Sequence, residues 1–262
     1  MRSCARRRAT PIFLSMPEIN PAASWQDPAV VEQFLKSVRG TIPLAIEQVD
    51  MMLRLVTAAC NGRLERFLEV GGGQGVLSSA LLDEHPHAGG WLVDLSQDLL
   101  SAARQRLHGR QRVEFIKADF AHAGWTAAIN AGAPFDAIVS ALSIHVLTDA
   151  RKRELYTEIF NLLKPDGIFI NIEHVASATR WTESVLDDYM IDAIFGQAIK
   201  AAPGRTRAEV AREYYAQAGT AALAPLEVQC DWLREIGFEN VDCYLKVGEL
   251  ALFGGQRGGS KQ

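Results

Sequence analysis

A dense group of glycines near residue 70 has the composition of a ligand-binding turn. An apolar run over 67–70 predicts a buried strand, and the run 71–75 predicts a turn into a helix that begins near Val76. Because glycine has no side chain, a ligand can lie against the backbone N–H groups of such a turn. The spacing Gly-x-Gly-x-Gly differs from the Gly-x-Gly-x-x-Gly of dinucleotide sites, which disfavours nicotinamide and flavin cofactors. The alternative interpretation is a tight strand-to-helix crossing that binds nothing.

Two carboxylates stand where the next predicted strands end. Asp94 ends the apolar run 90–94, and Asp119 follows the run 113–117. A carboxylate beside a glycine turn can accept hydrogen bonds from both hydroxyls of a ribose, and Asp119 can accept one from an adenine amino group. The alternative for each carboxylate is that it is a solvated residue at the end of a strand and binds nothing.

A histidine follows the fourth predicted strand, 137–141. Open parallel sheets bind ligands at the carboxyl ends of their strands, and an imidazole with a pKa of about 6.5 can take a proton from an acceptor. His145 is therefore the candidate general base, and the alternative is that it packs against or caps the following helix. Ser140 and Ser143 are expected to line the cavity. His174 ranks below His145, and exposed positions are expected for His85, His87, His108 and His122.

Strand and helix patterns alternate along the chain and must position these residues. Strands are predicted over 66–70, 90–94, 113–117, 137–141 and 167–172. Helices are predicted from the N-cap Ser96, over 149–163 and over 226–236. Two final strands, 239–247 and 249–253, are joined by so short a turn at Gly248 that they must be antiparallel. The pattern indicates an α/β fold, a parallel sheet with helices on both faces and a C-terminal antiparallel hairpin.

The order of these motifs resembles the class I S-adenosylmethionine-dependent methyltransferases. The resemblance covers about Arg66 to Val175 and the terminal hairpin, and it depends on the run 69–75, on Asp94, on 118–120 and on 162–167. It implies the Rossmann-like, seven-stranded methyltransferase fold with S-adenosyl-L-methionine as cofactor. The expected reaction is an in-line displacement that moves a methyl group to a small-molecule acceptor.

The resemblance also implies roles for individual residues. The turn makes room for the methionine portion of the cofactor, with Glu69 orienting it. Asp94 holds the ribose hydroxyls, Asp119 faces the adenine amine, and Leu95 and Phe120 enclose the adenine ring. The expected cofactor-binding residues are therefore Glu69, Gly71, Gly72, Gly73, Gly75, Asp94, Leu95, Asp119, Phe120 and Ser140.

The segments outside the motifs are expected to select the acceptor. Residues 1–24 are predicted to be a disordered extension, with Met16 as a possible translation start, and residues 25–262 to be a single domain. Helical patterns predict an N-terminal cap over 25–62 and a helical lid inserted over 176–224. Aromatic residues in these segments suit an apolar or planar acceptor, or else bury the insertion against the sheet. They are Trp25, Phe34, Trp181, Tyr189, Tyr214 and Tyr215.

Charge and composition exclude several classes of partner. The 262 residues carry a net charge of -4, and four arginines in the first eight residues leave the remainder at -8. An acidic body is unsuited to nucleic acid, and an Asp/Asn-Pro-Pro-aromatic motif is missing from 140–144. No apolar run approaches the roughly 20 residues of a membrane span. The four cysteines show no metal-ligand spacing, so a cytoplasmic protein with reduced thiols is expected. No catalytic metal is expected either, because the fourth strand does not end in a carboxylate and Asp166, Asn171 and Glu173 are expected to serve the turn and the sheet edge.

The leading hypothesis is a small-molecule methyltransferase, with oxygen slightly favoured as the acceptor atom because of His145. The three consecutive glycines, 71–73, resemble the turn of plant and antibiotic O-methyltransferases, although the chain lacks room for their N-terminal dimerisation domain before Arg66. A homodimer through the hairpin or the N-terminal helices is possible. The alternatives are a cofactor-binding protein without catalysis and an enzyme that performs a different sulfonium reaction.

Overall fold

The computed structural model describes residues 43–201, 203–218 and 222–259. Within these residues, seven strands form one sheet in the order β3-β2-β1-β4-β5-β7-β6. The parallel strands are β1 (Arg66–Val70), β2 (Gly89–Asp94), β3 (Val113–Lys117), β4 (Phe135–Ala141) and β5 (Leu163–His174). The antiparallel pair is β6 (Phe238–Val247) and β7 (Leu250–Arg257), and β7 also pairs with β5. The predicted fold class is confirmed.

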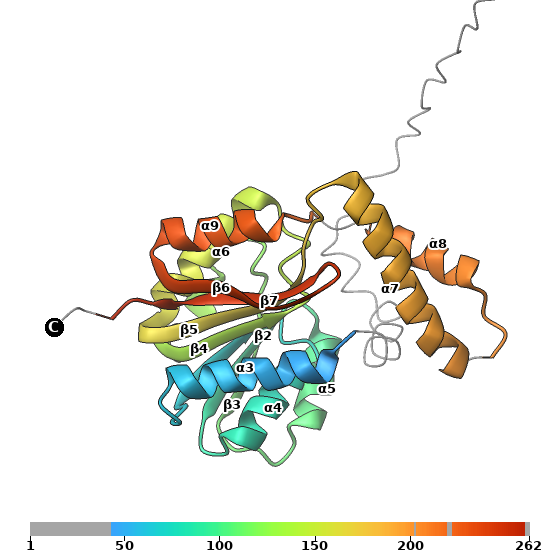
Figure 1. Cartoon of the computed structure of the whole chain (residues 1–262). Coiled ribbons are helices and arrows are strands. Elements are labelled where there is room, and N and C mark those ends of the chain that lie inside the picture. The colour runs from blue at the N-terminus through green and yellow to red at the C-terminus, as the bar shows by residue number, and fades with distance from the viewer. Residues whose placement is uncertain (1–42, 202, 219–221, 260–262) are drawn as a thin grey trace, which may run out of the picture.

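Helices cover both faces of the sheet (Figure 1). On one face lie α3 (Ala45–Ala59), α4 (Val76–Glu84) and α5 (Gln97–Arg106), and on the other lie α6 (Asp149–Leu162) and α9 (Leu226–Ile236). The inserted helices α7 (Arg180–Ala201) and α8 (Arg207–Ala218) stand beyond the carboxyl ends of the parallel strands. The insertion is therefore placed at the edge where such sheets bind ligands.

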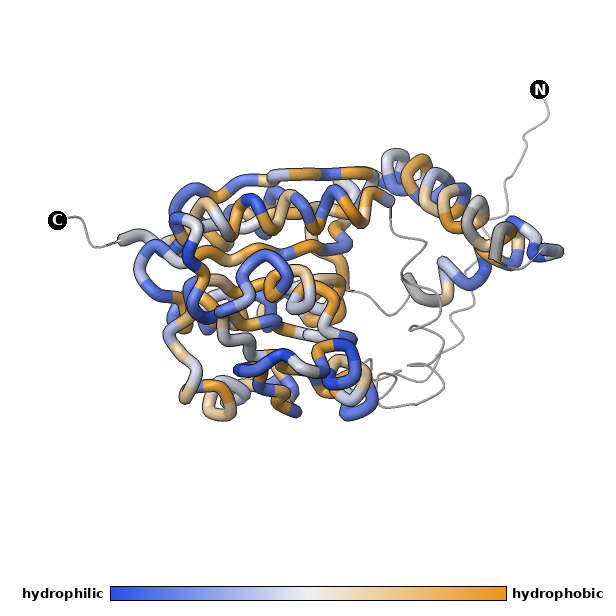
Figure 2. The backbone as a smooth tube through the Cα atoms, turned by 90° about the horizontal axis from the view of Figure 1, so that it is seen from below, coloured by the Kyte–Doolittle hydropathy of each residue, from blue (hydrophilic) through white to orange (hydrophobic). Residues whose placement is uncertain are grey.

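Each parallel strand contributes to two hydrophobic cores. In β1, Phe67 packs into the core beneath α3 and α4, whereas the adjacent Leu68 packs into the core beneath α6 and α9. A strand that is buried on both faces is apolar at nearly every position, which explains the continuous apolar runs in the sequence. Figure 2 shows this concentration of hydrophobic residues along the strands in the interior of the domain.

Several sequence expectations differ from the observed elements. The fifth strand is predicted to begin at 167, but β5 already begins at Leu163, which pairs with Phe135, and the register shifts before Ile168. His85 was expected to be exposed. It is buried instead, and its Nε2 lies 3.0 Å from the Thr57 hydroxyl of α3. The predicted extension 1–24 and the first part of the predicted N-terminal cap, with Trp25 and Phe34, lie outside the described residues.

The described residues also bear on three other expectations. Ser96 is confirmed as the N-cap of α5, since its hydroxyl accepts a hydrogen bond from the Leu99 amide at 3.3 Å. Cys60, Cys230 and Cys243 are free thiols. In the part of the chain that the structure describes, no helix has both the length and the apolarity needed to cross a membrane.

Candidate functional site

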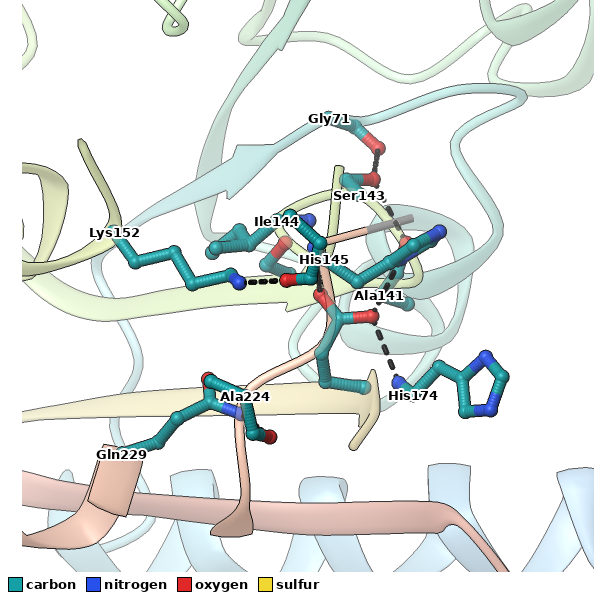
Figure 3. A network of polar contacts seen from close by, with 12 residues as sticks. Gly71, Ala141, Ser143, Ile144, His145, Lys152, His174, Ala224 and Gln229 are labelled. Atoms are coloured by element: carbon teal, nitrogen blue, oxygen red, sulfur yellow. Dashed lines mark hydrogen bonds and ion pairs between the residues drawn. The ribbon is translucent and has the colours of Figure 1, made fainter. Parts of the chain in front are cut away.

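The glycine turn after β1 contacts the loop after β4. A Cβ atom on Gly71 would lie 2.2 Å from the Ser143 hydroxyl oxygen, so only glycine permits this approach. Ser143 Oγ donates to the carbonyls of Gly71 at 3.1 Å and Ala141 at 2.8 Å. Figure 3 shows Ser143 between Gly71 and His145. The predicted cofactor turn and the predicted base thus belong to one site.

One side of the turn is packed and the other is open. Cβ atoms on Gly72 and Gly75 would lie 3.1 Å and 3.2 Å from the Leu92 side chain, so these glycines allow close packing on β2. At Gly73, where φ is +49°, the nearest atom to an added Cβ would be the Gly71 carbonyl oxygen, 3.9 Å away. A ligand therefore has room to approach the backbone at Gly73, as the methionine portion of the predicted cofactor requires.

Asp94 joins this turn to the end of β2. It is buried, and its two oxygens accept hydrogen bonds from the amides of Gly73 at 2.9 Å and Ser96 at 2.8 Å. Burial raises the pKa of Asp94, although these hydrogen bonds oppose the shift. A carboxylate offers about four acceptor positions, so Asp94 retains capacity for the ribose hydroxyls of a cofactor.

Glu69 connects β1 to the first turn of α4. Its Oε2 accepts hydrogen bonds from the Ser78 amide, at 3.0 Å, and from the Ser78 hydroxyl. Because the first amides of a helix lack intrahelical partners, this contact fixes the start of α4 relative to the strand. Burial raises the pKa of Glu69 to about 7, despite the hydrogen bonds from Ser78. The role of Glu69 in orienting the turn stays a prediction.

A residue of α6 contacts the loop that is predicted to bind adenine. Leu95, Asp119 and Phe120 are partly exposed at the ends of β2 and β3, and Asp119 Oδ1 accepts from the Ala121 amide at 2.9 Å. The buried Arg151 of α6 donates from Nε to the Phe120 carbonyl at 3.0 Å. Arg151 gave no sequence signal, because an arginine on an amphipathic helix is ordinarily solvent-exposed.

Ser140 lies deeper than expected. Its side chain is fully buried, and its hydroxyl donates to the Val70 carbonyl at 2.9 Å across the β1–β4 pair. This hydrogen bond joins the two central strands directly before the site. Of the two serines considered for the cavity, Ser143 is the one that contacts the glycine turn.

The buried carboxylate of Glu173 binds both the ring and the backbone amide of His145. Glu173 was expected to serve the sheet edge, but β7 pairs with β5, so the strand is internal and Glu173 is fully buried. Its Oε1 lies 2.8 Å from Nδ1 of His145, and its Oε2 accepts from the amides of Ile144 at 2.9 Å and His145 at 3.0 Å. The N-cap of α6 is Thr148, so His145 does not cap that helix.

Electrostatics determine which nitrogen of His145 is free. Burial raises the pKa of Glu173, but the charge of His145 and the hydrogen bonds to the carboxylate outweigh burial, and the net pKa is lowered. An ionised Glu173 accepts a proton-bearing Nδ1, which leaves the lone pair of His145 on Nε2. The imidazole side chain is 19% exposed. The role of His145 as a general base stays a prediction, and a ring oriented in this way is what that role requires.

Among the described residues, no group of three or more His, Cys, Asp and Glu side chains is arranged to hold a metal ion. A reaction without a catalytic metal stays a prediction.

Two comparisons of the sequence identify relatives. A family model described as a methyltransferase domain matches residues 67–167, which include the glycine turn, Asp94, Asp119 and His145. A demethylmenaquinone methyltransferase from Clavibacter sepedonicus is 28% identical over 192 residues, which is 73% of this chain and 73% of that protein.

Solved structures share the fold. An O-methyltransferase family protein from Burkholderia thailandensis aligns with a TM-score of 0.56 and 19% identity, covering 87% of this chain and 63% of that chain. Human N-acetylserotonin methyltransferase, solved in complex with S-adenosylmethionine, aligns with a TM-score of 0.58 and 14% identity, covering 90% and 58%. The chain thus spans about three fifths of the length of these neighbours. A methyltransferase family model thus matches the part of the chain that carries the glycine turn and His145, and solved methyltransferases share the seven-stranded fold.

Proposed function

We propose that this methyltransferase methylates an oxygen atom of a small-molecule acceptor, with His145 as the general base. The observation that carries the proposal is the pair of His145 and the buried Glu173, 2.8 Å apart, next to the turn that would receive the cofactor. Ser143 supports the placement, since it contacts Gly71 and lies two residues before His145 in the same loop.

S-adenosylmethionine supplies an activated methyl group, so the protein mainly has to align the acceptor and exclude water. We propose that the open backbone at Gly73 holds the methionine portion and that Asp94 holds the ribose. The remaining predicted contacts stand as part of this proposal: Glu69, Gly71, Gly72, Gly75, Leu95, Asp119, Phe120 and Ser140.

The proposed proton transfer uses both nitrogens of His145. Nδ1 donates to Glu173, which fixes the ring and stabilises the imidazolium that forms. Nε2 would take the hydroxyl proton of the acceptor as its oxygen forms a bond to the methyl carbon and the bond from that carbon to the cofactor sulfur breaks, with S-adenosylhomocysteine as the leaving group. A neutral hydroxyl requires this proton transfer, which is why an oriented base favours oxygen as the acceptor atom.

The insertion favours an apolar or planar acceptor. Trp181 of α7 and Tyr215 of α8 are exposed, with Trp181 77% exposed, so neither buries the insertion against the sheet. Tyr189 of α7 is half-exposed and lies near Gly248 in the β6–β7 turn. Because α7 and α8 stand beyond the carboxyl ends of the parallel strands, we propose that the insertion covers the acceptor. The acidic composition supports a small molecule rather than nucleic acid.

The test is a methyl-transfer screen with ¹³C-methyl S-adenosylmethionine and a panel of hydroxylated aromatic acceptors, with products assigned by mass spectrometry and NMR. We expect a labelled O-methyl product with the wild type and with His108→Ala, a variant of an exposed histidine. Cofactor binding without transfer to any acceptor would favour a non-catalytic binding protein. A cofactor-derived product other than S-adenosylhomocysteine would favour a different sulfonium reaction.

A further inference from the structure

A second carboxylate–histidine pair lies beside the proposed base. His174 is the last residue of β5, and its Nε2 lies 3.1 Å from Oε2 of Glu249 in the β6–β7 turn. Glu249 is buried, and its other oxygen accepts a hydrogen bond from the Ser177 hydroxyl. The imidazole of His174 is therefore oriented in the same way as that of His145, by a separate carboxylate.

The two pairs are physically joined. The ring centroids of His145 and His174 are 6.3 Å apart with 59° between the ring planes, and the side chains are 19% and 21% exposed. The backbone amide of His174 donates at 2.9 Å to Oε1 of Glu173, the same oxygen that holds the His145 ring. Glu173 thus fixes one histidine through its ring and the other through its backbone.

The imidazole of His174 is not required to hold the backbone where the insertion begins. The Val175 amide already donates to the Glu249 carbonyl at 2.8 Å, and the Ala176 amide donates to the Ala224 carbonyl at 3.1 Å. Within the described part of the chain, no protein hydrogen bond reaches Nδ1 of His174 or Nε2 of His145. Two oriented and partly exposed imidazoles, each with one free nitrogen, remain at the carboxyl edge of the sheet.

We propose, on the basis of the function proposed above, that these imidazoles form a paired site for an acceptor with two adjacent oxygens. His145 binds the hydroxyl that is methylated, and His174, whose Nε2 donates to the Glu249 carboxylate, accepts a hydrogen bond from the neighbouring hydroxyl at Nδ1. Each hydrogen bond spans about 2.7–3.2 Å, so a planar ligand that lies across the two rings, whose centroids are 6.3 Å apart, can place one of two adjacent oxygens within reach of each ring. The substrate class is therefore a planar, vicinally dioxygenated molecule.

The test uses calorimetric titration with two matched probes, 2,3-dihydroxynaphthalene and 2-naphthol, in the presence of saturating S-adenosylhomocysteine. We expect the wild type and His108→Ala to bind the diol at least tenfold more tightly than 2-naphthol. In His174→Ala this preference should disappear, with diol affinity reduced and 2-naphthol affinity unchanged. His174→Phe, which retains a ring without its nitrogens, should behave in the same way and provides a second reading if the alanine variant does not fold.

Three results would overturn the paired site: equal binding of both probes by the wild type, binding of neither, or equal weakening of both probes by the His174 substitutions. The last result is what a purely structural histidine predicts. Diol preference without methyl transfer would reject the proposed reaction and retain the paired site. Methylation of both probes with rates and affinities unaffected by His174→Ala would retain the reaction and reject the paired site.

Discussion

The two halves of the carboxyl edge of the sheet use buried carboxylates in opposite ways. At the ends of β1 and β2, Glu69 and Asp94 accept hydrogen bonds from backbone amides, and burial raises the pKa of both. Near the ends of β5 and β6, Glu173 and Glu249 pair with histidines. There, burial also raises each pKa, but the histidine partners, together with hydrogen bonds from backbone amides and Ser177, outweigh it and the net pKa is lowered.

This difference separates two tasks. Backbone amides are fixed donors, so the β1–β2 half is a rigid frame suited to holding a ligand of constant shape. Imidazoles gain and lose protons near neutral pH, so the β5–β6 half is suited to proton transfer and to recognition of hydroxyl groups. Changes in one half should therefore affect cofactor affinity, and changes in the other should affect turnover.

The largest expected effect is that of His145→Ala on the rate of methyl transfer. Loss of a positioned general base lowers kcat by about 10²–10⁴-fold, whereas the affinity for S-adenosylmethionine should remain within about twofold because the contacts at Gly73 and Asp94 are unchanged. Steady-state kinetics and calorimetry on the same preparation measure both quantities. Full turnover by the variant would show that the reaction needs no base at this position.

The next effect concerns the pH dependence of stability at Glu69. Its folded pKa of about 7 lies above the ordinary value of 4.5, so its contribution to the free energy of unfolding is fully present below pH 4.5 and is lost as the pH rises through 7. This contribution amounts to about 3 kcal/mol. Urea unfolding of wild type and Glu69→Gln from pH 5 to pH 8 should show the wild type losing that stability relative to the variant. Glu84→Gln, an exposed control, should follow the wild type.

Glu173 should show the opposite sign. Its folded pKa is lowered, so its contribution is present above the unfolded pKa and is lost as the pH falls through the folded value. Relative to Glu173→Gln, the wild type should therefore lose stability on acidification below about pH 4.3. If the free energy of unfolding of the Glu69 and Glu173 variants, relative to the wild type, changed with pH in the same direction, the proposed difference between the two halves would be contradicted.

The two halves also differed in how far the sequence predicted them. The bounds of β1, β3 and α9 and the Ser96 cap were predicted closely, because each depends on local periodicity or on a local hydrogen bond. The glycine turn and Asp94 lie within one strand–helix–strand unit. Their proximity follows from the parallel order of β1 and β2.

The histidine partners were missed because they are distant in the sequence. Glu173 lies 28 residues from His145, and Glu249 lies 75 residues from His174, so only the β5–β7 pairing brings Glu249 into place. The same pairing makes β5 internal and buries Glu173. A signal was nevertheless present: a glutamate within the apolar run 168–172 and its continuation is costly to bury without a partner.

The central claim, that the two halves divide cofactor binding from proton transfer, is tested most directly by S-adenosylmethionine titration of wild type, Asp94→Ala, His145→Ala and the exposed control Asp98→Ala. Loss of hydrogen bonds to a charged group costs about 1.5–3 kcal/mol, so Asp94→Ala should bind the cofactor about 10- to 100-fold more weakly. His145→Ala and Asp98→Ala should match the wild type. Wild-type affinity in Asp94→Ala, or equal weakening in Asp94→Ala and His145→Ala, would contradict the division.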